Sequence, residues 1–194
     1  MYQTSIIFMK TFNKAIRILL FTNGFTLLAA AMIGPIYALF VESVGGNLLD
    51  ASLTGAAFAF AAGITLLVFG KITDKIKRKY LLIVIGYALM GFGYLAFLWV
   101  DSMFTLLMVQ ILIGIGGAIY APAFDALYSL NLNRKREGFG WGTWEAMSQF
   151  AVAIGSIMGG LVATYYGFPL LFLAMATLCF VSAIYVLLTP KSLL

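Results

Sequence analysis

Long charge-free apolar stretches, separated by short segments that carry charges, dominate the pattern of the chain. Five stretches have the length of a membrane crossing or more, at 18–41, 51–70, 80–100, 102–124 and 146–190. A helix that crosses a bilayer core about 30 Å thick needs about 20 apolar residues. The last stretch is long enough to cross twice, and Gly167 and Pro169 supply a turn within it. The pattern predicts one all-α integral membrane domain over 1–194, a six-transmembrane-helix bundle with helices at 15–41, 51–70, 80–100, 103–130, 141–164 and 168–189.

Composition supports this class and excludes several others. Hydrophobic residues make up 63% of the chain and charged residues 10%, whereas soluble proteins average about 25% charged. The chain has no histidine and a single cysteine, Cys179. Ser-His-Asp catalysis, histidine-ligated zinc, multi-cysteine metal sites and internal disulfides are therefore excluded. We expect no enzyme activity, no cofactor and no metal site.

The net charge of +5 is a signal of topology. All 12 basic residues fall before the first helix or in its first turn, between helices two and three, between four and five, or after the sixth. The opposite loops carry only the acids Glu42, Asp50 and Asp101. Since cytoplasmic loops are enriched in Lys and Arg, we expect a multi-pass protein of the plasma (inner) membrane with both termini cytoplasmic. The charges imply a lipid bilayer as partner and no nucleic acid, and any self-assembly should be parallel.

A motif lies between the second and third expected helices. Residues 70–79 read GKITDKIKRK and resemble the signature loop of the major facilitator superfamily, G-x-L-x-D-R-x-G-R-R/K. Lys77 stands where the family has glycine. The resemblance implies a gating loop, carried by the matching residues Gly70, Asp74, Arg78 and Lys79 and by the close replacement Lys75.

A second motif lies on the fifth expected helix. Residues 151–160 read AVAIGSIMGG and are similar to the family's antiporter motif g-x-x-x-G-P-x-x-G-G, with Ser156 in place of its proline. The resemblance covers all six expected helices, which are one half of the family's usual twelve. It implies a half-size member that resembles the N-terminal half of a major-facilitator fold, itself a 3+3 inverted repeat. The implied function is secondary active transport by alternating access, with proton antiport as one form of it.

Two alternatives stay open beside this interpretation. The chain could be a split or truncated half-transporter that requires a different partner half. It could also be a six-helix channel, although the sequence contains no repeated pore motif and no Asn-Pro-Ala. All three interpretations place the chain in a membrane, and they differ in which unit completes the path of the solute across it.

Small residues recur at every fourth position on the second and fifth expected helices. This spacing places them on one stripe of each helix, where backbones can approach closely. The stripes either pack inside the bundle or, as the resemblance suggests, face another half. With no second half in the sequence, the second reading predicts a parallel, two-fold homodimer. Its interface would comprise Gly55, Ala59, Gly63, Ala151, Gly155 and Gly159.

Two acids, Asp125 and Glu145, are expected at membrane depth, where ionisable groups are functional candidates. Each is a candidate proton carrier or a latch acid, and we expect Asp125 to pair with Arg78. The resemblance also implies that Asp74 lies near the start of the partner's fifth helix.

The cavity that the fold implies would be lined by helices one and four, with help from two and five. Its candidate polar groups are few and uncharged, so they suit an uncharged, amphipathic or cationic small molecule as substrate. They are Thr22, Asn23, Thr26, Tyr37, Gln110 and Tyr120.

Overall fold

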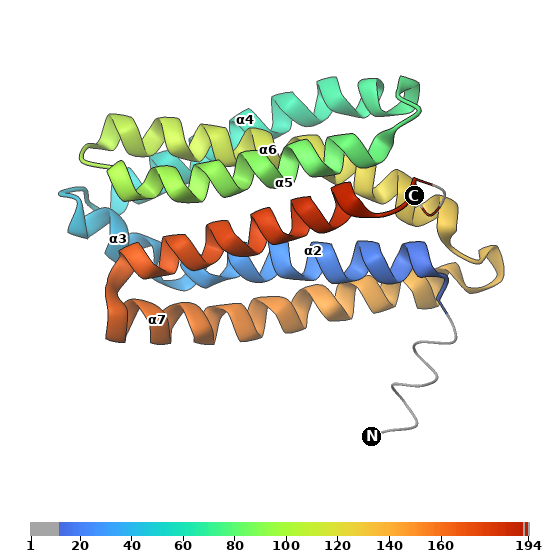
Figure 1. Cartoon of the computed structure of the whole chain (residues 1–194). Helices are drawn as coiled ribbons and strands as arrows, with labels where there is room; N and C mark the ends of the chain where they lie inside the picture. The colour runs from blue at the N-terminus through green and yellow to red at the C-terminus, as the bar shows by residue number, and fades with distance from the viewer. Residues whose placement is uncertain (1–11, 192, 194) are drawn as a thin grey trace.

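The computed structural model describes residues 12–191 and 193, and this part of the chain is helical without strands (Figure 1). The long helices are α2 (Lys14–Ile33), α4 (Leu48–Lys75), α5 (Lys79–Ala96), α6 (Met103–Asn131) and α7 (Glu137–Leu188). Short elements join them, namely η1 (Gly34–Ile36), α3 (Tyr37–Ser43), η2 (Phe97–Trp99) and η3 (Arg134–Arg136). Five helical segments of the described chain are long and apolar enough to cross a membrane. The predicted class, an all-helical membrane protein, is confirmed.

The fifth and sixth expected helices form a single element of 52 residues, α7. Its backbone leaves the helical region at Gly167, where φ is +81°, a conformation that glycine adopts without a Cβ penalty. Pro169 follows in the first turn after the break, where proline is tolerated. Figure 1 shows the chain reversing here, so the first arm of α7 (137–166) and its second arm (168–188) run in opposite directions.

The first expected helix, 15–41, is divided in the structure. The α-helix ends at Ile33, and a 3-10 turn that contains Pro35 leads into the short helix α3. Proline lacks a backbone N–H and its ring clashes with the carbonyl of the preceding turn, so it interrupts the regular helix. This change of direction turns Tyr37 toward α4, where its hydroxyl lies 2.6 Å from Thr54 Oγ1.

The second helix is longer at both ends than the expected 51–70. At its start, the Asn47 side chain accepts a hydrogen bond from the Asp50 N–H (3.1 Å), and the Asp50 carboxylate accepts one from the Asn47 N–H (2.9 Å). This reciprocal pair is a capping box, which satisfies backbone donors that the first helical turn leaves free. At its end, the Lys79 ammonium donates to the carbonyls of Thr73 (2.8 Å) and Ile76 (3.0 Å). Both caps together extend α4 through Gly70 and Asp74, so much of the expected loop is helical.

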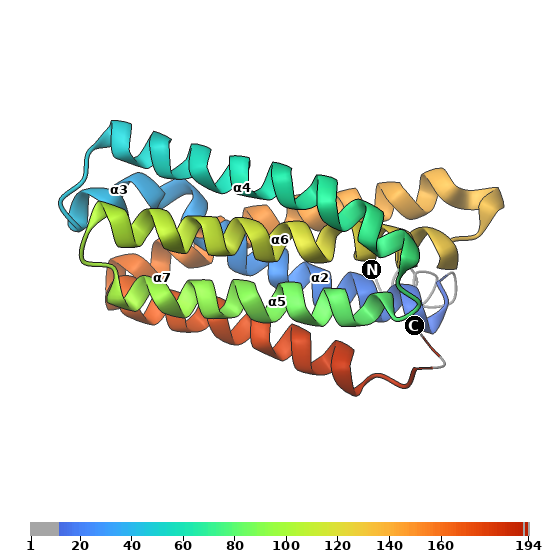
Figure 2. The same ribbon diagram turned by 90° about the horizontal axis from the view of Figure 1, so that it is seen from above.

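Glycines bring the helices close together. A Cβ on Gly114 of α6 would lie 2.5 Å from the carbonyl oxygen of Phe58 on α4. On the other side of α6, a Cβ on Gly86 of α5 would lie 2.6 Å from the Gly116 carbonyl oxygen. In lipid, such close backbone approach supplies packing energy where the hydrophobic effect between helices is absent. Viewed from above, α4 forms one edge of the bundle and the second arm of α7 the other (Figure 2).

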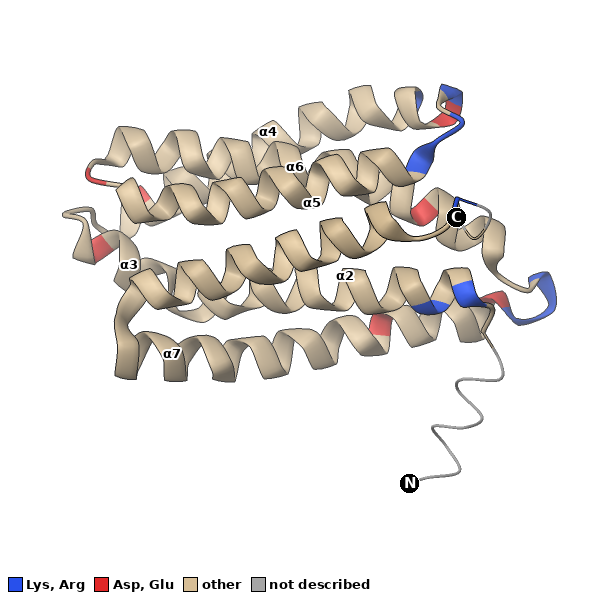
Figure 3. Cartoon of the chain, in the orientation of Figure 1, with Lys and Arg blue, Asp and Glu red and all other residues tan. Residues whose placement is uncertain are grey.

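Charges gather at the two ends of the bundle (Figure 3). The end we call the basic end holds the start of α2, the junction of α4 with α5, and the segment between α6 and α7. Basic residues there include Lys14, Arg17 and the run at 134–136, whereas Lys10 lies outside the described residues. The opposite end carries Glu42, Asp50 and Asp101. The helices between the two ends are nearly free of charge, as a membrane-spanning bundle requires.

Candidate functional site

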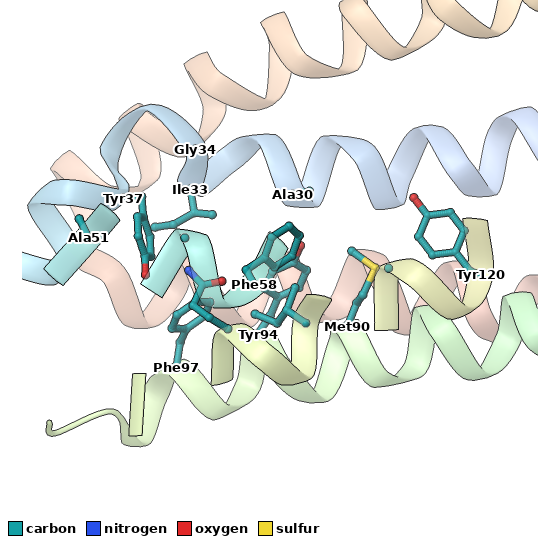
Figure 4. Close-up of a pocket in the computed structure, with 14 residues that line it drawn as sticks. Ala30, Ile33, Gly34, Tyr37, Ala51, Phe58, Met90, Tyr94, Phe97 and Tyr120 are labelled. Atoms are coloured by element: carbon teal, nitrogen blue, oxygen red, sulfur yellow. The ribbon is translucent and has the colours of Figure 1, made fainter. Parts of the chain in front are cut away.

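A cavity of about 470 Å³ opens in the half of the bundle opposite the basic end (Figure 4). It lies between α2, α4, α5 and α6, with η1 and α3 at its outer end. Aromatic and aliphatic side chains form most of its wall, and none of the residues that line it is charged. The lining comprises Ala30, Ile33, Gly34, Tyr37, Ala51, Gly55, Phe58, Met90, Tyr94, Phe97, Gln110, Ile113, Gly117 and Tyr120.

The cavity has few polar groups, and they differ in whether their hydrogen-bonding atoms are already paired within the protein. The Tyr37 hydroxyl is already engaged with Thr54 Oγ1 at 2.6 Å. The Gln110 carboxamide forms no hydrogen bond with the described part of the chain, so its donor and acceptor remain available to a ligand. Two turns further along α6, Gly117 leaves open space, because a Cβ there would meet nothing within 4 Å. A small apolar molecule with one or two polar groups fits such a site best.

Three of the six expected cavity residues line this pocket, namely Tyr37, Gln110 and Tyr120. The other three, Thr22, Asn23 and Thr26, are at most 1% exposed and lie between helices on the basic side of the pocket. A buried polar side chain without a hydrogen-bond partner is costly in an apolar medium. The polar groups of these three residues have such partners inside the protein.

The hydrogen bonds of these three buried residues are specific. Thr22 Oγ1 donates to the Ile18 carbonyl (2.9 Å), and Thr26 Oγ1 donates to the Thr22 carbonyl (3.1 Å). Asn23 Nδ2 donates to the Tyr87 hydroxyl (3.4 Å), and Asn23 Oδ1 accepts from Trp144 Nε1 (3.0 Å). Thr22 and Thr26 thus bond within α2, and Asn23 holds α2 against α5 and α7. The expected place of all three in the cavity is corrected.

The third helix contributes a wall of the cavity that the sequence did not indicate. Met90 and Tyr94 of α5, with Phe97 of η2, face the pocket, and no residue of α7 lines it. The expected residues came from helices one and four, with help expected from two and five, so the contribution of the third helix was missed. The only sequence signal was the recurrence of Met and aromatic residues at a spacing of three to four, which a packed core produces equally well.

The residues of the signature motif lie at the basic end. Asp74, Lys75 and Arg78 are exposed, and a Cβ on Gly70 would meet nothing within 4 Å. Arg78 precedes α5 as its N-cap residue. Among the described residues neither Arg78 nor Asp125 has an ion-pair partner, so the expected bridge between them is not formed. Lys79 instead caps the end of α4, which the motif alone did not indicate.

The two stripes of small residues have different surroundings. On α7, Ala151, Gly155 and Gly159 are buried. A Cβ on Gly155 would lie 2.7 Å from the Leu28 carbonyl oxygen, and one on Gly159 would collide with the carbonyl of Met32, so this stripe packs on α2 of the same chain. It is therefore not available to a second copy, and its assignment to a dimer interface is corrected. On α4, Ala59 and Gly63 are exposed and Gly55 borders the cavity, so that stripe is open.

Comparison with known proteins identifies the family. The sequence model of the Major Facilitator Superfamily matches residues 19–193. The chain belongs to this superfamily. Its members are transporters, so the expectations that the protein is a transporter-family member and not an enzyme are confirmed.

Relatives within the Major Facilitator Superfamily differ in length. The chain is 26% identical to an uncharacterised MFS-type transporter of Methanocaldococcus jannaschii, covering 82% of this chain and 41% of that protein. It is 27% identical to the multidrug resistance protein MdtG of Proteus mirabilis, covering 94% of this chain and 46% of that protein. The chain thus spans about half the length of these curated relatives. The uncharacterised MFS-type transporter YitZ of Bacillus subtilis is 21% identical, and there the match covers 80% of this chain and 94% of the relative.

The two acids that were expected at membrane depth, Asp125 and Glu145, also have defined surroundings. Glu145, on the first arm of α7, is exposed and accepts a hydrogen bond from Gln149 Nε2 at 2.9 Å. Asp125, one residue after the buried Phe124 of α6, is exposed as well. Neither carboxylate is paired with a basic residue in the described chain. A carboxylate is too costly to leave in lipid, so both require water or a polar partner at their faces.

Proposed function

We propose that the protein is a secondary active transporter for small amphipathic molecules that are uncharged or cationic. The observation that carries this proposal is the cavity between α2, α4, α5 and α6, whose lining is rich in aromatic side chains and contains no charged residue. Aromatic faces attract organic cations and apolar rings alike, whereas the cavity offers nothing to balance a phosphate or a dicarboxylate. The name of the Proteus mirabilis relative, a multidrug resistance protein, supports export of such molecules as the direction of transport.

The membrane topology belongs to this proposal. We infer six crossings, with the two arms of α7 spanning the membrane separately on either side of Gly167 and the whole forming a 3+3 inverted repeat. The basic end faces the cytoplasm because Lys and Arg concentrate in cytoplasmic loops. In this orientation both termini are cytoplasmic, the membrane is the plasma (inner) membrane, and the cavity opens toward the outside.

Alternating access requires a second unit against which this bundle can rock, and we propose that a second copy supplies it in a parallel, two-fold homodimer. Two open stripes support this arrangement. One is the stripe of α4 with Gly55, Ala59 and Gly63. The other is a polar and small stripe on the first arm of α7 that does not face α2, and it comprises Glu145, Gln149, Ser156 and Gly160.

The remaining outer face of the first arm of α7 is different in character. Phe150, Ile154 and Ile157 are large, apolar and exposed, and their spacing places them together on one face. This face suits lipid, and the stripe with Glu145 suits a partner or a watery cavity between two halves. In the dimer, Asp74 at the end of α4 would lie beside the start of the partner's α7, where a helix N-terminus favours a negative charge. Making and breaking that contact would gate the basic end.

Disulfide cross-linking between copies tests the dimer. Ala59→Cys and Ser156→Cys, introduced into separately tagged chains that also carry Cys179→Ala, lie about the same number of residues from the end opposite the basic one. We expect cross-linked dimers in membranes for this pair and none for the control pair Ala59→Cys with Ile157→Cys. Equal cross-linking in both pairs, or in neither, would refute the proposed interface and favour a different partner half.

Transport itself is tested with the reconstituted protein in vesicles. We expect uptake of labelled tetraphenylphosphonium, driven by a pH gradient, that saturates and is competed by uncharged amphipathic molecules but not by a dicarboxylate. Ion conduction at channel rates without solute accumulation would show that the protein is a channel and not a carrier.

We assign proton coupling to Glu145, because it lies on the open polar stripe of α7. Unchanged pH-driven uptake in Glu145→Gln would exclude this role, and the same measurement on Asp125→Asn tests the second acid.

A further inference from the structure

A groove runs along the outside of the bundle between α2 and the second arm of α7, at the basic end. It consists of two adjoining hollows of about 480 and 330 Å³, which share Lys14, Ile18 and Tyr185 in their linings. The groove is separate from the cavity described above and has no lining residue in common with it.

One face of α2 provides the first wall of the groove and grades from charged to apolar. Lys14, Arg17, Ile18 and Phe21 follow the spacing i, i+3, i+4, i+7, which aligns them on one side of a helix. Lys14 is the first residue of α2, and Phe21 lies about 10 Å further along its axis. Cations therefore lie at the membrane surface, and an exposed aromatic ring lies deeper.

The second arm of α7 provides the other wall. Its side toward the groove is apolar, with Val181 and Leu188 among the lining residues, and it contains no charged residue between 168 and 188. Tyr185 reaches across to α2, where its ring centroid lies 5.9 Å from that of Phe21. Neither Lys14 nor Arg17 has an acidic partner among the described residues. The groove thus offers two uncompensated positive charges above an apolar channel.

We propose that this groove binds an anionic phospholipid. The phosphate would lie between Lys14 and Arg17 at the level of the headgroups, and an acyl chain would lie along Ile18 and Val181 toward Phe21. The order of groups along the groove matches the order in a phospholipid, from charged headgroup to hydrocarbon. Zwitterionic lipids have the same acyl chains but a compensated headgroup, so the two basic side chains select for net negative charge.

Native mass spectrometry of the full chain, released from mixed vesicles of phosphatidylglycerol and phosphatidylcholine, measures this selectivity directly. We expect the wild-type protein to retain phosphatidylglycerol preferentially. In Lys14→Gln/Arg17→Gln the preference should fall roughly thirtyfold, because each basic residue near an anionic surface contributes about fivefold. The matched control is Arg134→Gln/Lys135→Gln, which removes the same charge from η3 at the same end of the bundle but away from the groove. It should retain the preference.

A second variant tests the apolar part of the site with both cations intact. Val181→Trp fills the channel, so it should reduce retention of phosphatidylglycerol without changing the surface charge. All four substituted side chains at positions 14, 17, 134 and 135 are exposed, so these variants should keep the wild-type melting temperature. Equal loss of preference in both charge variants would overturn the proposal in favour of a diffuse surface field. If Val181→Trp retains phosphatidylglycerol unchanged and inorganic phosphate displaces that lipid, the groove is a simple anion site and the proposal is overturned. If the variants lose dimers and not lipid, the groove is a contact between copies.

Discussion

The indole N–H of Trp144 donates a hydrogen bond of 3.0 Å to Oδ1 of Asn23, which ties the first arm of α7 to α2. The amide nitrogen of the same asparagine donates to the Tyr87 hydroxyl of α5 at 3.4 Å. One side chain that is 1% exposed thus joins three helices. Tyr87 in turn packs against Tyr120 with ring centroids 4.9 Å apart, and Tyr120 lines the cavity. Asn23 therefore fixes the basic side of the cavity without contacting its interior.

Replacement of Asn23 tests this role. In Asn23→Leu the Trp144 donor loses its acceptor, and we expect the protein to be destabilised by about 1 kcal/mol, since hydrogen bonds between membrane helices average about 0.6 and reach about 1.7 kcal/mol. Thermal unfolding in detergent measures the change. Trp144→Phe should cost a similar amount, and the double variant should cost less than the sum of both. Additive losses would show that the two side chains do not interact.

The charge pattern and the length of the apolar runs were sufficient to predict an all-helical membrane protein. Gly167 and Pro169 marked the reversal of α7 because backbone geometry at a break depends on the residues at that point. The ends of α4 were harder to place, because Asn47, Asp50 and Lys79 extend the helix through side-chain hydrogen bonds that hydropathy does not register. Hydropathy thus located the helices, and the local side-chain caps that set their ends were missed.

The cavity was less predictable, since it depends on which face each helix turns inward. Thr22 and Gln110 are both polar residues on apolar helices, yet Thr22 bonds to its own helix and Gln110 faces the pocket. The stripes of small residues on α4 and α7 have the same spacing, yet only the stripe of α7 is covered by α2. Spacing determines which residues share a face, and only the packing of the whole bundle determines what that face meets.

The contact between the first arm of α7 and α2 predicts a sharp contrast between two adjacent glycines. A Cβ at Gly159 would collide with the Met32 carbonyl, whereas a Cβ at Gly160 would meet nothing within 4 Å. Backbone atoms cannot yield as a flexible side chain can, so Gly159→Ala should separate the helices and lower the free energy of unfolding by about 2 kcal/mol. Gly160→Ala should leave the melting temperature nearly unchanged. The reverse order, or equal effects, would contradict the packing of α7 on α2.

The cap on α4 predicts distinct effects for two lysines of the signature motif. Lys79 donates to the Thr73 and Ile76 carbonyls, whereas Lys77 is exposed and forms no hydrogen bond with the described chain. Lys79→Met should therefore destabilise the end of α4, at a cost of about 1 kcal/mol for the lost cap. Hydrogen exchange over residues 70–76 would measure the loosening. Lys77→Met is the control, and faster exchange in that variant as well would mean that general charge, and not the cap, orders this segment.

The open space beside Gly117 and the free carboxamide of Gln110 predict two separable effects on transport. Gly117→Phe should fill the cavity, because no atom lies within 4 Å of the added Cβ, and uptake of tetraphenylphosphonium should fall at least tenfold while the melting temperature is kept. Gln110→Ala removes a polar group and adds space. It should weaken transport of molecules that carry a hydrogen-bonding group by about fivefold, the value of one hydrogen bond of about 1 kcal/mol, and leave purely apolar cations unaffected. Ile154→Phe, which adds a ring on the exposed apolar face of α7 and outside the cavity, controls for the bulk of the substitution. Full transport by Gly117→Phe would place the substrate elsewhere in the protein, and a uniform loss across all substrates in Gln110→Ala would make that residue a support for the fold and not a determinant of specificity.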